Sequence, residues 1–347
     1  MKFSIIIPVY NRPDEVDELL ASLSTQTERD FEVIVVEDGS TTPCEDVCEK
    51  YKDRLTLSYY KKKNSGPGQS RNFGAERAKG EYLIILDSDV VLPEGYIAAV
   101  KNELEATHAD AFGGPDSAHE SFTDIQKAIS YSMTSFFTTG GIRGGKKKLD
   151  KFYPRSFNMG IRRDVYLQLG GFSKMRFGED IDFSYRIVEA GYNPRLFPDA
   201  WVWHKRRTDF RKFFRQVYNS GIARINLEKR HPGTLKLVHL LPMVFTAGVI
   251  ALILIAAVAR AMIHYDAPNW HTWYWICLLA LSPILFYSLI IFIDSSIKNK
   301  SMKVGLLSVP AAFVQLMGYG FGFIESWWKR CVMKKDEFQA FEKNFYK

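Results

Sequence analysis

Two aspartates that follow an apolar run are the clearest candidates in this sequence for binding a metal ion. Asp87-Ser88-Asp89 comes directly after Tyr82–Leu86, so both carboxylates are expected at the end of a buried strand. Two hard oxygen ligands this close together suit Mg²⁺ or Mn²⁺, which bind carboxylates along with substrate phosphates. Because Asp-Ser-Asp is also common in solvated turns, the triplet alone does not establish a metal site.

Three other segments carry polar groups that fit the same chemistry. Asp38 ends a second apolar run, where its carboxylate is placed to accept hydrogen bonds from a base or a ribose. Residues 64–72 form a Gly- and Ser-rich loop that leads into a helix, and Arg71 in this loop is long enough to reach a diphosphate. Residues 178–182 open another helix with three carboxylates. One acid suffices to stabilise a helix N-terminus, so at least one of the three is predicted to belong to a site.

The elements that position these groups follow from hydrophobic periodicity. Apolar runs alternate with segments of helical spacing, which predicts a parallel, doubly wound α/β sheet. Ligands bind such sheets at the carboxyl ends of the strands, where Asp38, Asp87 and Asp89 fall. The predicted strands are residues 3–9, 31–36, 55–60 and 82–86, and the predicted helices are 14–23, 66–78, 164–169 and 180–190. Residues 113–158 are predicted to be loop-like around one apolar segment.

The C-terminal third has a different character. Residues 237–263, 273–293 and 304–328 are apolar segments that approach or exceed the ~20 residues needed to span a bilayer. The first two are clear candidates, whereas the third contains Pro310, Gln315 and four glycines. These segments exclude an entirely soluble protein.

The placement of basic residues favours a membrane partner over nucleic acid. The chain has 46 Lys and Arg against 39 Asp and Glu. From 205 to 230, nine Lys and Arg face only Asp209 and Glu228, immediately before the apolar segments. Within that stretch Phe210, Phe213, Phe214 and Val217 share one helix face, which predicts an amphipathic helix in the membrane interface. A surface helix docked on the protein is the alternative. No nucleic-acid-binding motif is present.

Charge counting predicts the orientation in the membrane. Arg260, near the end of the first segment, is the sole Lys or Arg from there to the start of the second, whereas Lys298, Lys300 and Lys303 follow the second. The N-terminal domain and this second connection are therefore expected on the cytosolic side. The tail is also basic, which conflicts with a third crossing, although the length of the third segment favours one. We expect a multi-pass protein of the cell (inner) membrane whose catalytic domain is cytoplasmic.

The polar segments together resemble the family 2 glycosyltransferases. The resemblance covers about residues 3 to 205 and implies an α/β catalytic domain of the GT-A fold, Rossmann-like with a mostly parallel sheet, followed here by C-terminal transmembrane helices. It also implies inverting transfer from a nucleotide-sugar donor (a UDP- or GDP-sugar). The motifs that carry it, in the family's order and spacing, are Ser4–Asn11, Glu37–Ser40, Gly66–Asn72, Asp87–Asp89 and Gly178–Asp182.

The resemblance implies a role for each matching residue. Asp180 corresponds to the catalytic base, with Glu179 beside it, and Asp182 is expected to orient or cap. Asp87 and Asp89 would hold the donor diphosphate, Asp89 more directly through Mg²⁺ or Mn²⁺. The residues that would line the nucleotide pocket are Pro8, Tyr10, Asp38 and Arg71.

His204 is open to two interpretations. Some members of the family have a metal-binding histidine at a comparable point, and neutral imidazole is a competent ligand. Alternatively, His204 packs among Trp201 and Trp203 or faces lipid head groups beside Lys205.

One departure from the family pattern bears on the reaction. Processive members carry a Gln-x-x-Arg-Trp motif, and residues 215–224 lack the Arg-Trp pair. We therefore expect transfer of a single sugar to a membrane-associated acceptor, a lipid-linked sugar or a glycolipid. Residues 130–139 and the Gly- and Lys-rich run 140–148 are candidate acceptor contacts. The competing hypotheses are a polyprenyl-phosphate sugar synthase and a membrane scaffold with a decayed transferase domain.

These expectations divide the chain into four regions. Residues 1–204 would form the catalytic domain, 205–233 a basic interfacial segment, 234–330 the membrane domain and 331–347 a polar tail.

Overall fold

The computed structural model describes residues 1–117, 122–139, 152–175, 177–265 and 268–336. It divides into two compact units. The first comprises chiefly residues 1–117 and 152–205, and the second comprises residues 122–139 and 206–335. The change of unit after Lys205 lies next to the boundary predicted after residue 204. Residues 122–139, expected within the catalytic domain, group with the C-terminal helices.

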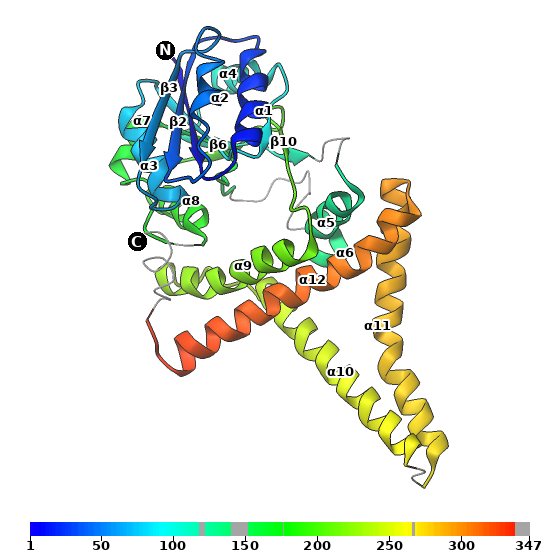
Figure 1. The fold of residues 1–347 in the computed structure, drawn as a ribbon. Helices are drawn as coiled ribbons and strands as arrows, with labels where there is room; N and C mark the ends of the chain where they lie inside the picture. Colours follow the sequence, from blue (N-terminus) through cyan, green and yellow to red (C-terminus); the bar gives the residue numbers. More distant parts are fainter. Residues whose placement is uncertain (118–121, 140–151, 176, 266–267, 337–347) are drawn as a thin grey trace. The chain divides into compact units, whose positions relative to one another are not determined.

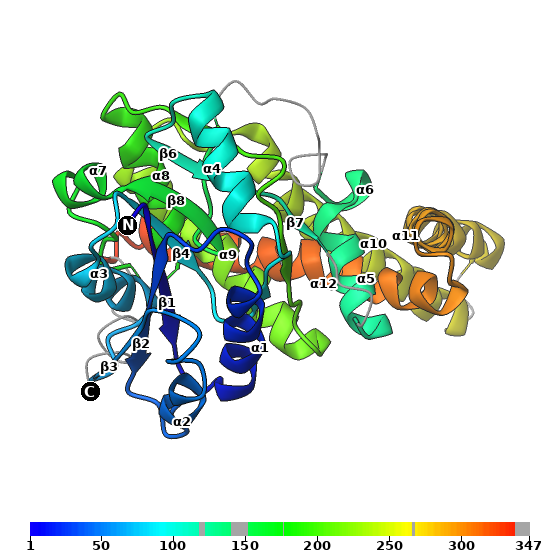
Figure 2. The same ribbon diagram turned by 90° about the horizontal axis from the view of Figure 1, so that it is seen from above.

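The first unit is built on a seven-stranded sheet, order β3-β2-β1-β4-β8-β6-β9 (Figures 1 and 2). The four predicted strands are confirmed, as β1 (Phe3–Val9), β2 (Phe31–Asp38), β3 (Leu57–Lys62) and β4 (Tyr82–Leu86). All four are parallel. The apolar runs of β1, β2 and β4 are buried, as a parallel sheet covered by helices requires, whereas β3 is half-buried and has no such run.

Three short strands, not predicted from the sequence, extend the sheet beyond β4. They are β8 (Asn158–Arg162), β6 (Ala111–Gly113) and β9 (Pro194–Leu196). β8 runs antiparallel to both β4 and β6, while β9 is parallel to β6. The sheet is therefore mostly parallel with one reversed strand, and this strand begins at Asn158, the last residue of the stretch 113–158 that is predicted to be loop-like.

Helices cover both faces of this sheet because alternate strand residues point to opposite sides. One core packs Ile5 and Ile7 of β1 against α1 (Pro13–Ser24), α2 (Glu45–Glu49) and α4 (Tyr96–Ala106). The other packs Ile6 against α3 (Pro67–Arg77), α7 (Arg163–Gln168) and α8 (Glu179–Glu189). The helices predicted from spacing are thus confirmed to within a few residues.

A second, three-stranded sheet lies beside the first. It consists of β5 (Val90–Val91), β10 (Val202–His204) and β7 (Asp116–Ser117), with β10 in the centre. β10 pairs antiparallel with β5 and parallel with β7. This small sheet connects three segments that are far apart in the sequence.

The second unit is helical. Its helices are α5 (Asp124–Thr134), α6 (Phe136–Thr139), α9 (Phe210–Arg230), α10 (Leu241–His264), α11 (Trp270–Asn299) and α12 (Met302–Trp327). The segments Leu237–His264, Trp270–Asn299 and Met302–Val332 are long and apolar enough to cross a membrane. In the third segment 44% of the most apolar stretch is buried inside the protein, against 17% and 11% in the first two.

Glycines allow α12 to lie directly along α9 (Figure 1). A Cβ on Gly322 would come within 2.0 Å of the Tyr218 carbonyl oxygen, and one on Gly221 within 2.2 Å of the Tyr319 carbonyl oxygen. Ser326 donates a hydrogen bond to the Ile222 carbonyl at 3.2 Å. The two helices therefore pack backbone to backbone over several turns, as small residues permit.

This packing covers part of the apolar face predicted for α9. Phe213 and Val217 are buried against Ile129 and Met133 of α5 and against Val314 of α12. Phe214, on the same face, is 37% exposed. The buried part fits the alternative of a helix docked on the protein, and a location of this segment in the membrane interface stays a prediction.

Candidate functional site

Asp87, Asp89 and His204 form a cluster that could hold a metal ion. Each offers one ligand atom, and these atoms lie within 4.8 Å of one another. Two carboxylate oxygens and an imidazole nitrogen suit a divalent ion of intermediate hardness such as Mn²⁺. The donor set therefore fits the metal that the sequence predicted. His204 lies beside Asp87 and Asp89, as its interpretation as a metal ligand requires, and that role stays a prediction.

The small sheet explains why these residues meet. The pairing of β10 with β5 sets His204 opposite Val90, the residue after Asp89. The Lys205 amide also donates to the Asp89 carbonyl at 3.0 Å. His204 Nε2 lies 3.3 Å from Asp89 Oδ1, and Phe157 stacks on the imidazole with ring centroids 4.9 Å apart. Backbone pairing and ring stacking together hold the imidazole in place.

Asp89 is a buried carboxylate with two basic neighbours. Arg12 Nη1 donates to Asp89 Oδ2 at 2.6 Å, and His204 lies on the other oxygen. Burial alone would raise the pKa of Asp89, but His204 and Arg12 hold this pKa well below its usual range. Asp89 is therefore ionised at neutral pH, as a metal ligand must be.

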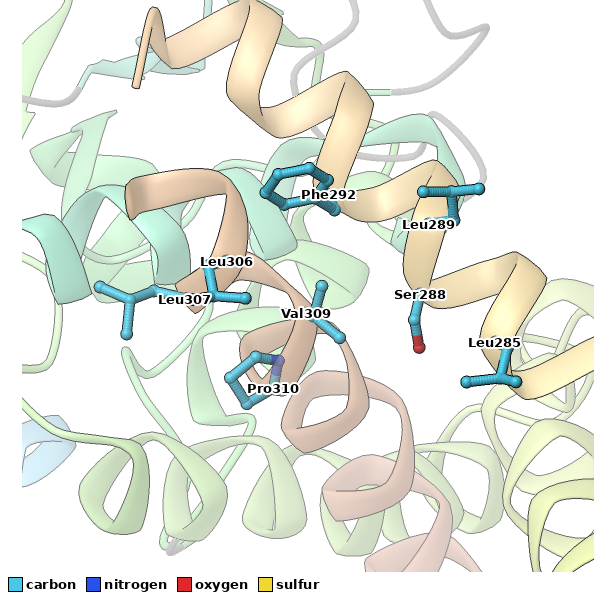
Figure 3. Close-up of a pocket in the computed structure, with 8 residues that line it drawn as sticks. All are labelled: Leu285, Ser288, Leu289, Phe292, Leu306, Leu307, Val309 and Pro310. Atoms are coloured by element: carbon cyan, nitrogen blue, oxygen red, sulfur yellow. The ribbon is translucent and has the colours of Figure 1, made fainter. Parts of the chain in front are cut away.

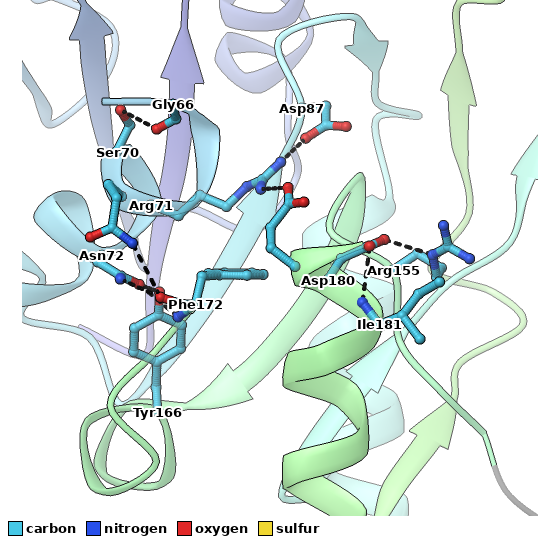
Figure 4. A network of polar contacts seen from close by, with 12 residues as sticks. Gly66, Ser70, Arg71, Asn72, Asp87, Arg155, Tyr166, Phe172, Asp180 and Ile181 are labelled. Carbon is cyan, nitrogen blue, oxygen red and sulfur yellow. Dashed lines mark hydrogen bonds and ion pairs between the residues drawn. The ribbon is translucent and has the colours of Figure 1, made fainter. Parts of the chain in front are cut away.

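Arg71 joins the metal-ligand cluster to the acidic helix start (Figure 4). Its Nη2 donates to Asp87 Oδ1 at 2.7 Å and its Nη1 to Glu179 Oε1 at 3.1 Å. The guanidinium also lies over the Phe172 ring, 5.1 Å from its centroid. Burial would lower the pKa of Arg71, but Asp87 and Glu179 keep this pKa above its usual value. A fixed positive charge thus stands between the two groups of carboxylates.

The start of α8 presents two carboxylates with different protonation behaviour. Gly178 precedes the helix with φ of +84°, a left-handed conformation that favours glycine. Burial raises the pKa of Glu179 to about 7, with Arg71 opposing and Asp180 adding to the rise. Burial would also raise the pKa of Asp180, but Arg155, whose Nε donates to Asp180 Oδ2 at 2.7 Å, holds this pKa below its usual value. Asp180 is therefore a carboxylate at neutral pH.

Asp182 and Asp38 have bonds that organise the site. Asp182 Oδ2 accepts from Ser173 at 2.8 Å and from Arg186 at 3.1 Å, which agrees with an orienting role. Asp38 accepts from Lys62 at 2.6 Å, and from the Ser65 and Gly66 amides at 2.9 and 2.8 Å. Its carboxylate thus shapes the loop before α3, and its contact with a base or ribose stays a prediction.

The ends of β1 and β2 are tied together beside this loop. Asn11 Oδ1 accepts from the Thr41 and Thr42 amides at 2.8 and 3.0 Å. Tyr10, next to Asn11, is 51% exposed, and Pro8 is half-buried. An exposed tyrosine ring at the carboxyl end of a strand is placed to stack on a base, but the nucleotide contacts of Pro8 and Tyr10 stay predictions.

The structure also brings in residues that sequence reasoning missed. They are Arg12, Arg155 and Asp116, the last with Oδ2 3.7 Å from His204 Nδ1. Arg12 lies shortly after the end of β1, and this position could have marked it as a site residue. Arg155 and Asp116 lie in the stretch predicted to be loop-like, where no periodicity marked them. The candidate acceptor run 140–148 lies outside the described residues.

Comparison with known proteins identifies the domain. Residues 4–170 match the family model described as Glycosyl transferase family 2. An uncharacterized glycosyltransferase of Rickettsia felis is 31% identical over 137 residues, 40% of this chain and 22% of the relative. The poly(ribitol-phosphate) β-N-acetylglucosaminyltransferase TarS of Staphylococcus aureus is 36% identical over 114 residues, 32% of this chain and 20% of TarS. The chain thus spans less than a quarter of the length of these relatives.

A solved structure supports the fold. The mannosyltransferase PcManGT from Pyrobaculum calidifontis, in complex with GDP-Man and Mn²⁺, superposes with a TM-score of 0.57 at 16% identity. The match covers 95% of this chain and 88% of the mannosyltransferase. The chain therefore has the predicted GT-A fold followed by apolar helices.

Proposed function

Since residues 4–170 place this chain among the family 2 glycosyltransferases, we propose that it transfers a single sugar from a UDP- or GDP-sugar to a membrane-associated acceptor. The observation that carries the proposal is the arrangement around Arg71. A possible metal-ligand cluster lies on one side of this guanidinium and the carboxylates of α8 on the other. The relative complexed with GDP-Man and Mn²⁺ supports a nucleotide-sugar donor and a metal.

We expect the donor diphosphate to bind beside the metal-ligand cluster and Arg71. Asp87, Asp89 and His204 would hold Mg²⁺ or Mn²⁺, and the ion would neutralise charge on the departing nucleoside diphosphate. Arg71 would bind a diphosphate oxygen, since a guanidinium is suited to bidentate contact with phosphate. Asp38 keeps the Ser65–Gly66 backbone in place beside the nucleotide.

Asp180 would act as the general base. The acceptor hydroxyl oxygen attacks the anomeric carbon as the bond to the diphosphate oxygen breaks, and Asp180 takes the hydroxyl proton. Attack opposite the leaving group inverts the configuration at that carbon. Arg155 orients the Asp180 carboxylate through the bond at 2.7 Å, and Glu179 positions Arg71.

Transfer to a membrane lipid is the expected result of the functional test. Purified full-length protein in vesicles that contain polyprenyl lipids should move label from a radiolabelled UDP- or GDP-sugar into an organic-extractable product in the presence of Mn²⁺. The matched controls are the same vesicles with EDTA and vesicles without protein. Label that appears only as free sugar, whichever donor and acceptor are supplied, would show hydrolysis and not transfer.

We also propose that α10 and α11 cross the membrane while α12 lies along its cytosolic face. α12 is packed against α9, and α9 has seven charged residues in 21 positions. A helix so charged does not enter hydrocarbon, so its partner is kept at the interface with it. This placement also removes the conflict in the charge count, because all the basic segments then lie on one side.

Cys331 gives a direct test of this topology, since it is exposed at the end of the third segment. In vesicles of known orientation, with Cys277 replaced by Ser, a membrane-impermeant maleimide should label Cys331 from the same side as Lys300→Cys. Pro268→Cys, before α11, should be labelled from the opposite side. If Cys331 instead reacts from the side of Pro268→Cys, α12 crosses and the proposed topology is wrong.

A further inference from the structure

The second unit contains an apolar groove where α11 and α12 diverge (Figure 3). It has a volume of about 570 Å³. Leu285, Leu289 and Phe292 line it from α11, and Leu306, Leu307 and Pro310 line it from α12. Ser288 is its one hydroxyl-bearing lining residue, and this hydroxyl donates to the Ile284 carbonyl of its own helix at 2.8 Å. The groove therefore offers a ligand hydrocarbon contact and no free polar group.

The groove opens outward and is not part of a closed core. Leu285 and Leu306 are each 66% exposed. They belong to two segments with the length and composition of membrane spans. In the proposed topology the groove lies where α11 leaves the membrane and α12 begins to follow its face, and apolar side chains at that boundary contact lipid chains.

One end of the groove is basic. The connection from α11 to α12 carries Lys298, Lys300 and Lys303, and Lys303 is one helical turn from Leu306. Lys298 pairs with Asp294 at 2.9 Å and Lys303 with Asp124 at 2.8 Å, while Lys300 is exposed. Three lysines against two aspartates leave an excess of positive charge where a lipid head group would lie.

The wall of the groove is also the docking surface of α5. Val309 of the lining packs with Tyr131 and Ile291, and Tyr131 donates to Asp294 at 2.6 Å. The Tyr287 hydroxyl donates to the Phe137 carbonyl at 3.2 Å. Residues 130–139, which the sequence indicated as candidate acceptor contacts, thus lie against the two helices that form the groove.

We propose that this groove binds the hydrocarbon chain of a single-chain lipid phosphate, a polyprenyl phosphate or its diphosphate-linked sugar, with the phosphate at Lys298, Lys300 and Lys303. A single groove beside a basic turn accommodates one chain that ends directly in phosphate. A diacyl phospholipid has two chains and a glycerol between them and the phosphate. The proposal rests on the proposed function, for which it names the acceptor class.

Photocrosslinking tests the groove without requiring sugar transfer. The full-length protein is placed in phosphatidylethanolamine–phosphatidylglycerol vesicles with a long-chain polyprenyl phosphate that carries a diazirine on its chain. Adducts should map by peptide mass spectrometry to α11 near Leu289 and to α12 near Leu306. Unlabelled polyprenyl phosphate should compete, whereas dioleoyl phosphatidic acid at the same concentration should not.

Two substitutions on α11 provide a matched comparison. Leu289→Trp fills the groove and should lower the adduct yield about tenfold, whereas Leu279→Trp, at an exposed position outside the lining, should change it less than about twofold. Lys300→Glu should also lower the yield, since it reverses a charge at an exposed position. A melting temperature in detergent near that of the wild type shows that each variant is folded.

The outcomes separate the groove from the activity. Adducts elsewhere, equal competition by phosphatidic acid, or equal loss in both tryptophan variants would each overturn the proposal. If the adducts behave as expected but no polyprenyl lipid accepts sugar, the groove stands and the proposed function fails. If lipid accepts sugar and Leu289→Trp transfers at the wild-type rate, the proposed function stands and the groove is wrong.

Discussion

Asp180→Asn should lower the rate of sugar transfer by about two to four orders of magnitude while leaving donor binding intact. Asparagine keeps the size of the side chain and one acceptor oxygen, so it retains one of the two bonds that Asp180 accepts, from Arg155 at Oδ2 (2.7 Å) or from the Ile181 amide at Oδ1 (2.9 Å). It cannot take a proton from the acceptor hydroxyl. The rate is measured in a single turnover, with nucleotide affinity and melting temperature alongside.

Two neighbouring substitutions separate base catalysis from structural roles. Glu179→Gln should cause a smaller loss, because Glu179 acts through Arg71, to which it bonds at 3.1 Å. Asp182→Asn weakens the contacts with Ser173 and Arg186, so it should lower the melting temperature more than the transfer rate. A transfer rate near wild type in Asp180→Asn would assign the base elsewhere, with Glu179 the next candidate because its pKa of about 7 suits proton transfer at neutral pH.

The sequence predicted those parts of the fold that depend on local patterns. The strands β1, β2 and β4 each contain a run of Ile, Val and Leu, and such runs are readable because strands buried on both faces are apolar at most positions. The three long apolar helices were predictable for a similar reason, since about 20 apolar residues in a row match the thickness of a bilayer. Because Asp87 and Asp89 directly follow a predicted strand, the sequence also placed them at the carboxyl edge of the sheet.

What the sequence did not predict depends on contacts between distant segments. β8 is only five residues long and runs antiparallel to its neighbours β4 and β6. This pairing leaves no periodic pattern of apolar residues in the local sequence. His204 meets Asp89 only because two residues of β10 pair with β5. The apolar period of α9 predicted the helix but not its packing against α5 and α12, because a helical period indicates which face is apolar and not which element contacts it.

Asp89→Asn should abolish the metal-dependent part of nucleotide binding. The substitution preserves the shape of the side chain but removes the charge that Arg12 and His204 stabilise at 2.6 and 3.3 Å. A neutral amide is a poor ligand for Mg²⁺ or Mn²⁺, so the cluster would be left with Asp87 and His204. We expect a loss in UDP or GDP affinity of about a hundredfold, equivalent to about 3 kcal/mol. Asp164→Asn, which alters an exposed carboxylate paired with Arg162, is the matched control.

Calorimetric titration of the full-length protein with UDP and with GDP, with and without Mn²⁺, tests the central claim most directly. The predicted result is that one of the two nucleotides binds the wild type and Asp164→Asn tightly when Mn²⁺ is present and weakly when it is absent. Asp89→Asn should bind weakly under both conditions. If neither nucleotide binds the wild type, or if Mn²⁺ and Asp89→Asn leave the affinity unchanged, then this cluster is not the metal site of a nucleotide-sugar transferase.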